Sequence, residues 1–189
     1  MKKVTFFAFT LFLATASFAQ SAWTADKAHT KLGFTVTHLS ISEVDGTFKS
    51  FEAKITSSKE DFSDAVFEFS ADIASVTTGN GMRDGHLQKE DMFDAAKFPK
   101  MTFKSTGISK VADKKYQLTG DLTIKGVTKK VTLNLVLLGT SMDQRSNKKV
   151  AGFKASGYIK RTDFGVGGMP SMVVSEDVEL RASGEFKAN

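Results

Sequence analysis

The sequence of 189 residues predicts an all-β fold: one eight-stranded antiparallel barrel with a short helical insertion near residues 80–95. Three observations support this prediction. Eight segments alternate apolar and polar residues with a period of two, which is typical of strands with one dry and one wet face. Polar turns join consecutive segments, as in antiparallel hairpins. One charged segment, RDGHLQKEDMFD (83–94), does not follow the strand pattern.

The first 19 residues are typical of a cleaved secretory signal peptide. A basic head (1–3) precedes an apolar run (4–16) and small residues at the expected cleavage site (17–19). The alternative, an uncleaved membrane anchor, is less favoured because the run is shorter than the roughly 20 apolar residues of a spanning helix. We therefore expect an exported protein whose single mature domain comprises residues 20–189.

Charge and cysteine content exclude several function classes. The sequence has no cysteine, so neither a disulfide nor a lipid-attachment cysteine is present. The formal net charge of +5 falls to +3 when Lys2 and Lys3 leave with the signal peptide. Basic residues are scattered rather than grouped with aromatics, which argues against nucleic-acid binding. The small positive excess favours at most a transient contact with an anionic membrane surface.

The eight alternating segments follow one another without a linker or an internal repeat. They are 32–38, 44–55, 67–73, 101–105, 116–124, 131–137, 151–159 and 178–186. Phe48 and Phe51 have opposite parity within their segment, which predicts a bulge or bend near Lys49 and Ser50. A tight hairpin is expected at residues 125–128 and a polar loop at 141–149. Sequential antiparallel strands with one wet face favour an up-and-down barrel over a sandwich.

The interior of such a barrel is either filled by side chains or hollow enough for one slender ligand. Inward positions combine bulky phenylalanines with small residues such as Gly120, Gly157 and Gly184, which is compatible with both arrangements. The sequence does not distinguish them. The candidate lining residues are Phe34, Val36, His38, Phe48, Phe69, Phe103, Leu122, Leu133, Leu135 and Phe153.

Several motifs, in order along the chain, are specific to one family. They are WTADKAHTKLGFTVTHL (23–39), SVTTGNGMRDGHLQKEDMFDAAKFPKMTFKST (75–106), GDLTIKGVTKKV (120–131) and RTDFGVG (161–167). With them the sequence resembles the YceI family of exported, lipocalin-like proteins. The resemblance implies a lipocalin-like barrel in the periplasm that carries a polyisoprenoid, such as a quinone or a prenyl phosphate, as its ligand. It implies no cofactor and allows a homodimer; a fatty acid or fatty amide is the alternative ligand.

The charged segment is interpreted as a lid on one end of the barrel. Asn80 is a good N-cap, and a helix continuing through Leu87 to Phe93 would turn its apolar face toward the barrel. Candidate residues of the lid and of a polar mouth are Met82, Arg83, His86, Arg161, Asp163, Met169 and Met172. Two structural alternatives stay open: Arg83 and Asp84 can form a buried or half-buried pair that simply fixes the helix to the rim, and the methionines can be gap-fillers.

Two other classes of protein are less well supported. The sequence has three histidines and neither a Gly-x-Ser-x-Gly nor a His-Glu-x-x-His motif, so we expect no catalytic and no metal-binding residues. A site formed by His38, His86 and a carboxylate is the remaining metal or enzyme alternative. An outer-membrane barrel would need aromatic girdles, whereas this sequence has one tryptophan and two tyrosines.

Overall fold

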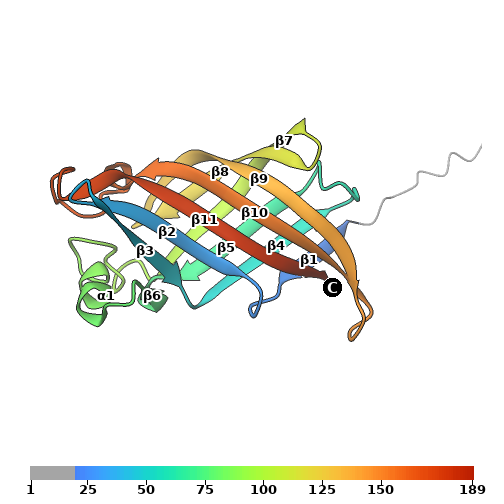
Figure 1. Cartoon of the computed structure of the whole chain (residues 1–189), viewed down its shortest axis with the longest axis horizontal. Helices are drawn as coiled ribbons and strands as arrows, with labels where there is room; N and C mark the ends of the chain where they lie inside the picture. The colour runs from blue at the N-terminus through green and yellow to red at the C-terminus, as the bar shows by residue number, and fades with distance from the viewer. Residues whose placement is uncertain (1–19) are drawn as a thin grey trace, which may run out of the picture.

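A computed structural model describes residues 20–189, so the predicted signal peptide lies outside the described residues. The described chain forms a closed antiparallel barrel with one short helix, α1 (Gly81–Leu87), below one of its ends (Figure 1). Two single-turn 3₁₀ segments, η1 (Ile73–Ser75) and η2 (Arg161–Phe164), also occur. Within residues 20–189 the helices are too short and too polar to cross a bilayer.

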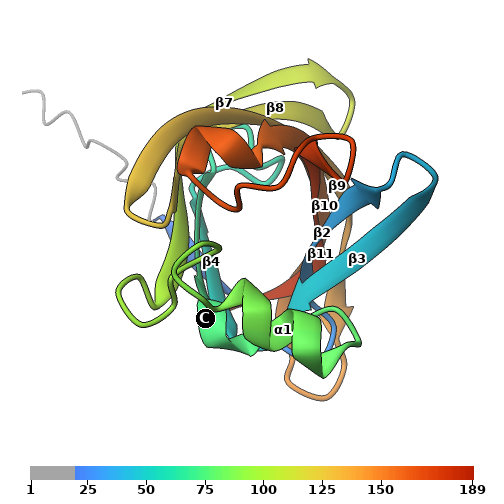
Figure 2. The same ribbon diagram turned by 90° about the vertical axis from the view of Figure 1, so that its left-hand side faces the viewer.

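The barrel wall has eight positions, as predicted, but three of them are filled by two successive strands. The strands are β1 (Ser21–Ala25), β2 (Lys31–His38), β3 (Ser42–Phe48), β4 (Phe51–Ser57), β5 (Val66–Asp72), β6 (Val76–Thr77), β7 (Lys100–Ala112), β8 (Lys115–Ile124), β9 (Val127–Asp143), β10 (Lys148–Lys160) and β11 (Val174–Ala188). Strands β1 and β2 share one position, because both pair with β11. In the next position β4 pairs with β1, and β3 pairs with β2. In the third, β5 pairs with β4, and β6 pairs with β3. The ring visible in Figure 2 is closed by the β11 pairings.

The predicted bend at Lys49 and Ser50 is confirmed. Strand β3 ends at Phe48 and β4 begins at Phe51, and both side chains are buried. Because the two residues between them interrupt the alternation, two phenylalanines of opposite parity face the same interior. The break also lets β3 and β4 pair with different neighbours, which helps to close the sheet.

The turns agree with the sequence at one hairpin and differ at another. Lys125 and Gly126 have φ angles of 50° and 75°, so β8 and β9 are joined by a two-residue turn with both residues in the left-handed region. The predicted polar loop at 141–149 is too long, because β9 extends to Asp143 and β10 begins at Lys148. Asp143 accepts hydrogen bonds from the Arg145 N–H and the Ser146 hydroxyl, which stabilise the short turn.

The helical insertion begins as predicted but ends earlier. The Asn80 side chain accepts hydrogen bonds from the N–H groups of Met82 and Arg83 at 3.1 Å each. The helix ends at Leu87 and not at Phe93, and residues 88–98 form successive turns. The chain folds back at once, because the Phe93 N–H donates to the Leu87 carbonyl at 3.0 Å. The segment therefore covers the barrel end as a compact helix and loop.

The end of the barrel farthest from α1 is filled by aromatic side chains. Phe153 lies at its centre and makes edge contacts with Phe62, Phe67 and Phe186, with ring centroids 5.0, 5.3 and 5.9 Å away. Trp23 packs against Phe62 at 5.2 Å. Such edge-to-face pairs add to the hydrophobic stabilisation of a core. This end is therefore largely filled by an aromatic core.

Candidate functional site

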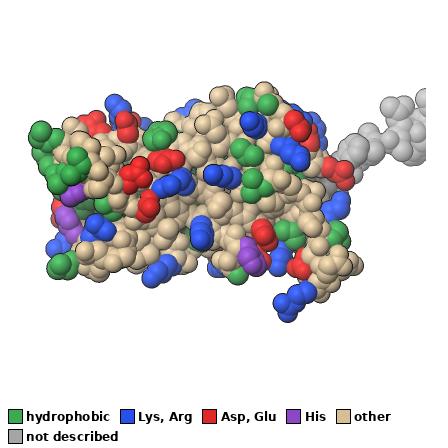
Figure 3. All heavy atoms as spheres, in the orientation of Figure 1, with side chains coloured by type: hydrophobic (Ala, Val, Ile, Leu, Met, Phe, Trp, Pro, Cys, Tyr) green, Lys and Arg blue, Asp and Glu red, His purple; other side chains and the backbone are tan. Residues whose placement is uncertain are grey.

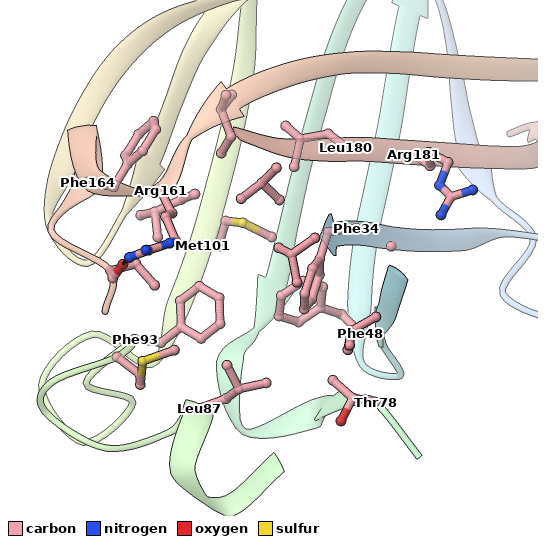
Figure 4. Close-up of a pocket in the computed structure, with 18 of the residues that line it drawn as sticks. Phe34, Phe48, Thr78, Leu87, Phe93, Met101, Arg161, Phe164, Leu180 and Arg181 are labelled. Carbon is pink, nitrogen blue, oxygen red and sulfur yellow. Dashed lines mark hydrogen bonds between the residues drawn. The ribbon is translucent and has the colours of Figure 1, made fainter. Parts of the chain in front are cut away.

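The other half of the barrel is hollow. A cavity of about 480 Å³ opens at the end that carries α1, and almost all of its lining is apolar. Figure 4 shows Phe34, Phe48, Phe93, Met101 and Leu180 around it, drawn from β2, β3, the insertion, β7 and β11. The interior is therefore neither completely filled nor completely hollow: aromatic side chains fill most of one end, and the large cavity occupies the other.

Glycines contribute less to this space than their inward parity indicates. A Cβ added to Gly120 would lie 2.4 Å from the Phe103 ring, and one added to Gly46 would lie 2.2 Å from the Phe34 ring. These glycines therefore admit a neighbouring aromatic ring and leave no void of their own. The cavity depends instead on small or medium side chains along β10 and β11, such as Ala155 and Ala182.

A second cavity of about 90 Å³ lies deeper in the barrel, beside the aromatic core. Phe69 lines both cavities and stacks on Phe103, with ring centroids 5.5 Å apart. Leu32, Leu133, Ala155 and Ala182 also line both. This layer therefore separates the large open cavity from the small deep one.

The predicted lining residues divide between the two cavities. Those at the large cavity are Phe34, Val36, His38, Phe48, Phe69, Leu122 and Leu133. Phe103, Leu135 and Phe153 line only the smaller one. Strand parity predicts that a side chain faces inward, but it does not predict its height along the barrel axis. Phe164 and Val166 line the large cavity and were not predicted, because they lie in an irregular segment without a period of two.

Arg83 and Asp84 fix α1 to the barrel, as the structural alternative predicts, but through a shared partner. Arg83 donates from Nε to the Thr78 hydroxyl at 2.7 Å and from a terminal nitrogen to the Thr78 carbonyl at 3.0 Å. Asp84 accepts from the Thr78 N–H at 2.7 Å, the Thr78 hydroxyl at 2.6 Å and the Thr77 hydroxyl at 3.0 Å. These hydrogen bonds, above all those of Thr78, lower the pKa of Asp84. The helix is thus held beside the mouth by one charged network.

The predicted mouth histidines both line the cavity. His86 Nε2 lies 2.9 Å from the Asp91 carboxylate, and this contact lowers the pKa of Asp91. His38 is the last residue of β2, next to the β2–β3 turn. The two imidazoles are therefore polar groups at an otherwise apolar opening.

Arg161 has a different role from the one predicted. It is buried, and it donates hydrogen bonds to the backbone carbonyls of five residues, at distances from 2.6 to 3.1 Å. The acceptors are Val166, Gly167, Met169, Val174 and Ser175. A guanidinium has five N–H donors, so all are engaged within the chain. Arg161 orders the loop before β11 and has no donor left for a ligand.

The remaining predicted mouth residues are dispersed. Met82 and Met169 line the opening, whereas Asp163 and Met172 are not part of the lining. Met82 was expected to face the barrel interior, but 87% of it is exposed at the outer edge. Lys125 was predicted only as a turn residue, yet its ammonium donates to the carbonyls of Glu90 and Gly165 at 2.7 and 2.9 Å. It joins the insertion to the loop on the other side of the mouth.

Metal ligation has little support at the mouth. Among residues 20–189 one group has metal-ligand spacing, Asp26, His29 and Glu185, and it includes neither His38 nor His86. Asp26 already binds the Lys187 ammonium at 2.9 Å and His29 at 3.1 Å, and these contacts lower its pKa. This group is an ordinary exposed charge cluster near the closed end of the barrel.

Comparison with known proteins identifies the family. The sequence profile of the YceI-like domain matches residues 23–186. The chain belongs to the YceI family. Relatives in the family include Protein YceI of Escherichia coli O157:H7, 38% identical over 138 residues (73% of this chain and 71% of the relative), and Protein YceI of Salmonella newport, 37% identical over 158 residues (82% of each).

Three solved structures share the fold. The Campylobacter jejuni YceI protein superposes with a TM-score of 0.74 at 37% identity, covering 87% of this chain and 96% of that chain. Burkholderia cenocepacia BcnA superposes with a TM-score of 0.77 at 26% identity, covering 85% and 98%. A domain from Saccharophagus degradans described as polyisoprenoid binding shares the fold with a TM-score of 0.63 at 16% identity, covering 90% of this chain and 100% of that one.

Proposed function

We propose that this YceI-family protein binds the hydrocarbon chain of an isoprenoid lipid, such as a quinone or a prenyl phosphate, in the large cavity and carries it in the periplasm. The observation that carries the proposal is the apolar cavity of about 480 Å³ beside the insertion that carries α1. Such a shape buries a flexible apolar chain and leaves a polar head group at the mouth. The description of the Saccharophagus degradans domain as polyisoprenoid binding agrees with this proposal.

The size of the cavity limits the ligand. A cavity of about 480 Å³ lies in the usual range of small-molecule pockets, so it encloses a short chain or one part of a long chain. The aromatic core behind Phe69 blocks deeper entry, since only about 90 Å³ lies beyond it. A longer tail would have to fold at the mouth or displace Phe69. A straight fatty chain of similar length would also fit, so the chemistry of the chain must be measured.

The charge at the mouth favours an electron-rich head group. The hydrogen bonds of Arg161 all go to carbonyl oxygens, so dipoles and not a carboxylate compensate its buried positive charge. Arg83, His38 and His86 can contact a phosphate or quinone oxygen directly, because they line the opening.

Energetics favour a carrier that meets its ligand at a membrane. A hydrocarbon chain leaving a bilayer for water would lose about 0.8 kcal/mol per CH₂. The chain is apolar and dry both in the bilayer and in the cavity, so transfer between them is nearly balanced. Shape fit and head-group contacts then decide occupancy, which suits reversible loading.

The polar groups Asp84, Asp91 and Arg161 at the mouth form hydrogen bonds within the chain, which stabilise the insertion and the loop before β11. These roles agree with binding without catalysis.

Mass spectrometry on protein purified natively tests the proposal. The intact protein should carry a stoichiometric adduct, and solvent extraction should release a prenyl-chain lipid. In the variant Ala155→Phe a ring would occupy the large cavity from β10, and we expect the adduct to disappear. The matched control is Ala112→Phe, on the exposed end of β7. Release of a straight-chain fatty acid or amide would redirect the proposal to that class, and an adduct retained by folded Ala155→Phe protein would refute the cavity as the binding site.

A further inference from the structure

Four large apolar side chains are exposed together at the open end of the barrel. They are Leu39, Ile41, Met82 and Met172, with 50, 84, 87 and 72% of each residue exposed. We call this set the apolar rim. Hydrophobic side chains gather at that end of the molecule in the space-filling view (Figure 3). An exposed group of this kind on a soluble surface marks an interaction site.

The rim residues come from three segments that surround the mouth. Leu39 and Ile41 lie in the β2–β3 turn, Met82 in the first turn of α1 and Met172 in the loop before β11. The Leu39 N–H donates to the Val173 carbonyl at 3.0 Å, which joins two of these segments. The side chains therefore surround the opening of the cavity and do not line a groove on the side of the barrel.

The β2–β3 turn gives an independent reason to regard the rim as functional. Leu39 and Ser40 have φ angles of 50° and 58°, and the Ile41 N–H donates to the His38 carbonyl at 3.1 Å. This is a β-turn in which both central residues are left-handed, a conformation for which Asn-Gly is strongly preferred, within a three-residue loop because His38 pairs with Ser42. Leucine is unfavourable at such a position for two reasons: a positive φ angle is sterically costly for it, and its apolar side chain is exposed to water. The turn itself therefore gives no reason for an exposed leucine at this position.

We infer that the apolar rim inserts into a lipid bilayer, so that the cavity mouth opens directly onto the hydrocarbon region. The inference rests on the proposed function, because a lipid chain that must not cross water requires the mouth to touch the membrane. Side chains spread over three separate segments suit a fluid surface better than the shaped groove of one protein partner. Exposed charges of both signs, such as Arg83 and Glu43, flank the rim, so insertion is expected to depend little on lipid charge.

Flotation with vesicles of pure phosphatidylcholine tests the inference. We expect the double variant Ile41→Ser/Met172→Ser to lose at least tenfold in vesicle partitioning, with little response to salt. The matched control is Val111→Ser/Leu138→Ser, because these two residues are 59 and 61% exposed on the barrel outside the rim. Equal partitioning of the two double variants, or a loss confined to the control, would overturn the inference.

Fluorescence supplies a second measurement that does not depend on weakened binding. A tryptophan in the variant Ile41→Trp should be quenched by brominated phosphatidylcholine, whereas one in Val111→Trp, near the opposite end, should not. The native Trp23 is buried at the closed end and serves as the common background. Absence of quenching at position 41, or sedimentation showing that the rim instead joins two copies of the chain, would also overturn it.

Failure of this inference is separable from failure of the proposed function. Uptake of a short-chain prenyl phosphate from detergent solution needs the cavity but no bilayer. Rim variants that load normally from detergent yet slowly from vesicles support rim insertion. If rim variants load from vesicles as fast as the native chain, rim insertion fails while the binding proposal stands. If the native chain takes up no lipid by either route but its rim still inserts, the binding proposal fails alone.

Discussion

Arg161 donates a hydrogen bond to the carbonyl oxygen of Met169 at 2.6 Å, so a buried cation in η2 holds the loop that borders the open mouth. Four further carbonyls of the same loop and of β11 accept from this guanidinium. Lys125 holds the loop from the other side through Gly165. The conformation of the mouth is therefore maintained by the charged side chains of Arg161 and Lys125, which donate hydrogen bonds to backbone carbonyls. Removing either side chain is expected to destabilise the mouth.

The variant Arg161→Ala should lower the free energy of unfolding by about 3 kcal/mol, because charged hydrogen bonds to several carbonyls are lost together. Arg161→Lys should recover only part of this loss, since an ammonium has three donors and no planar fork. Urea denaturation measures both values. The exposed Arg145→Ala serves as control and should change stability by less than about 0.5 kcal/mol. An equally mild effect at Arg161 would contradict its role in ordering the loop.

The anchoring of α1 should weaken in acid. The pKa of Asp84 is lowered in the folded state by its hydrogen bonds from Thr78 and Thr77, so the carboxylate stabilises the fold above the unfolded pKa of about 3.9. This stabilisation is lost as the pH falls through the lower folded pKa. An NMR titration of the Thr78 amide, which donates to Asp84, should therefore show a midpoint below 3.9. In Asp84→Asn this step should vanish; a midpoint at or above 3.9 would disprove the carboxylate anchor.

A substitution at Gly46, which does not line the large cavity, should change the shape of the cavity by moving the Phe34 ring. Gly46 pairs with Phe34 across β2 and β3, and a Cβ there would lie 2.2 Å from the Phe34 ring. Gly46→Val should displace that ring, lower stability by about 1–3 kcal/mol and reduce lipid uptake. Gly107→Val is the control, because no atom lies within 4 Å of its added Cβ. Normal uptake by folded Gly46→Val protein would show that the position of Phe34 is unimportant.

Phe69 should limit the length of the bound chain. It separates the two cavities, so Phe69→Ala should join them and admit longer chains, at a cost of about 3 kcal/mol in stability. Phe67→Ala removes a ring from the same strand but lines only the smaller cavity, and should leave chain length unchanged. Chain lengths of lipids extracted from each variant, measured by mass spectrometry, check the prediction. An unchanged length distribution in Phe69→Ala would mean that the mouth sets the limit.

Local patterns predicted most of the fold for a physical reason. The period of two is a property of the extended backbone, so inward and outward faces could be read directly from residues such as Leu118 and Leu122. The conflict of parity between Phe48 and Phe51 predicted a real break, and Asn80 predicted the start of α1. These features depend on near neighbours in the chain. Helix length was less predictable, because hydrogen bonds at Phe93 and Asp91 turn the chain back.

The tertiary structure alone decided where the barrel is hollow and what the mouth residues do. Alternation places Phe69 and Phe153 on the same inward face, yet strand stagger and tilt set their heights, so Phe69 borders the large cavity and Phe153 lies in the aromatic core beside the small one. Arg161 resembles a ligand-binding arginine in sequence, and only the folded loop shows that five carbonyls occupy its donors. Inward direction is a local property of a strand, whereas empty space and hydrogen-bond saturation depend on all the segments that meet there.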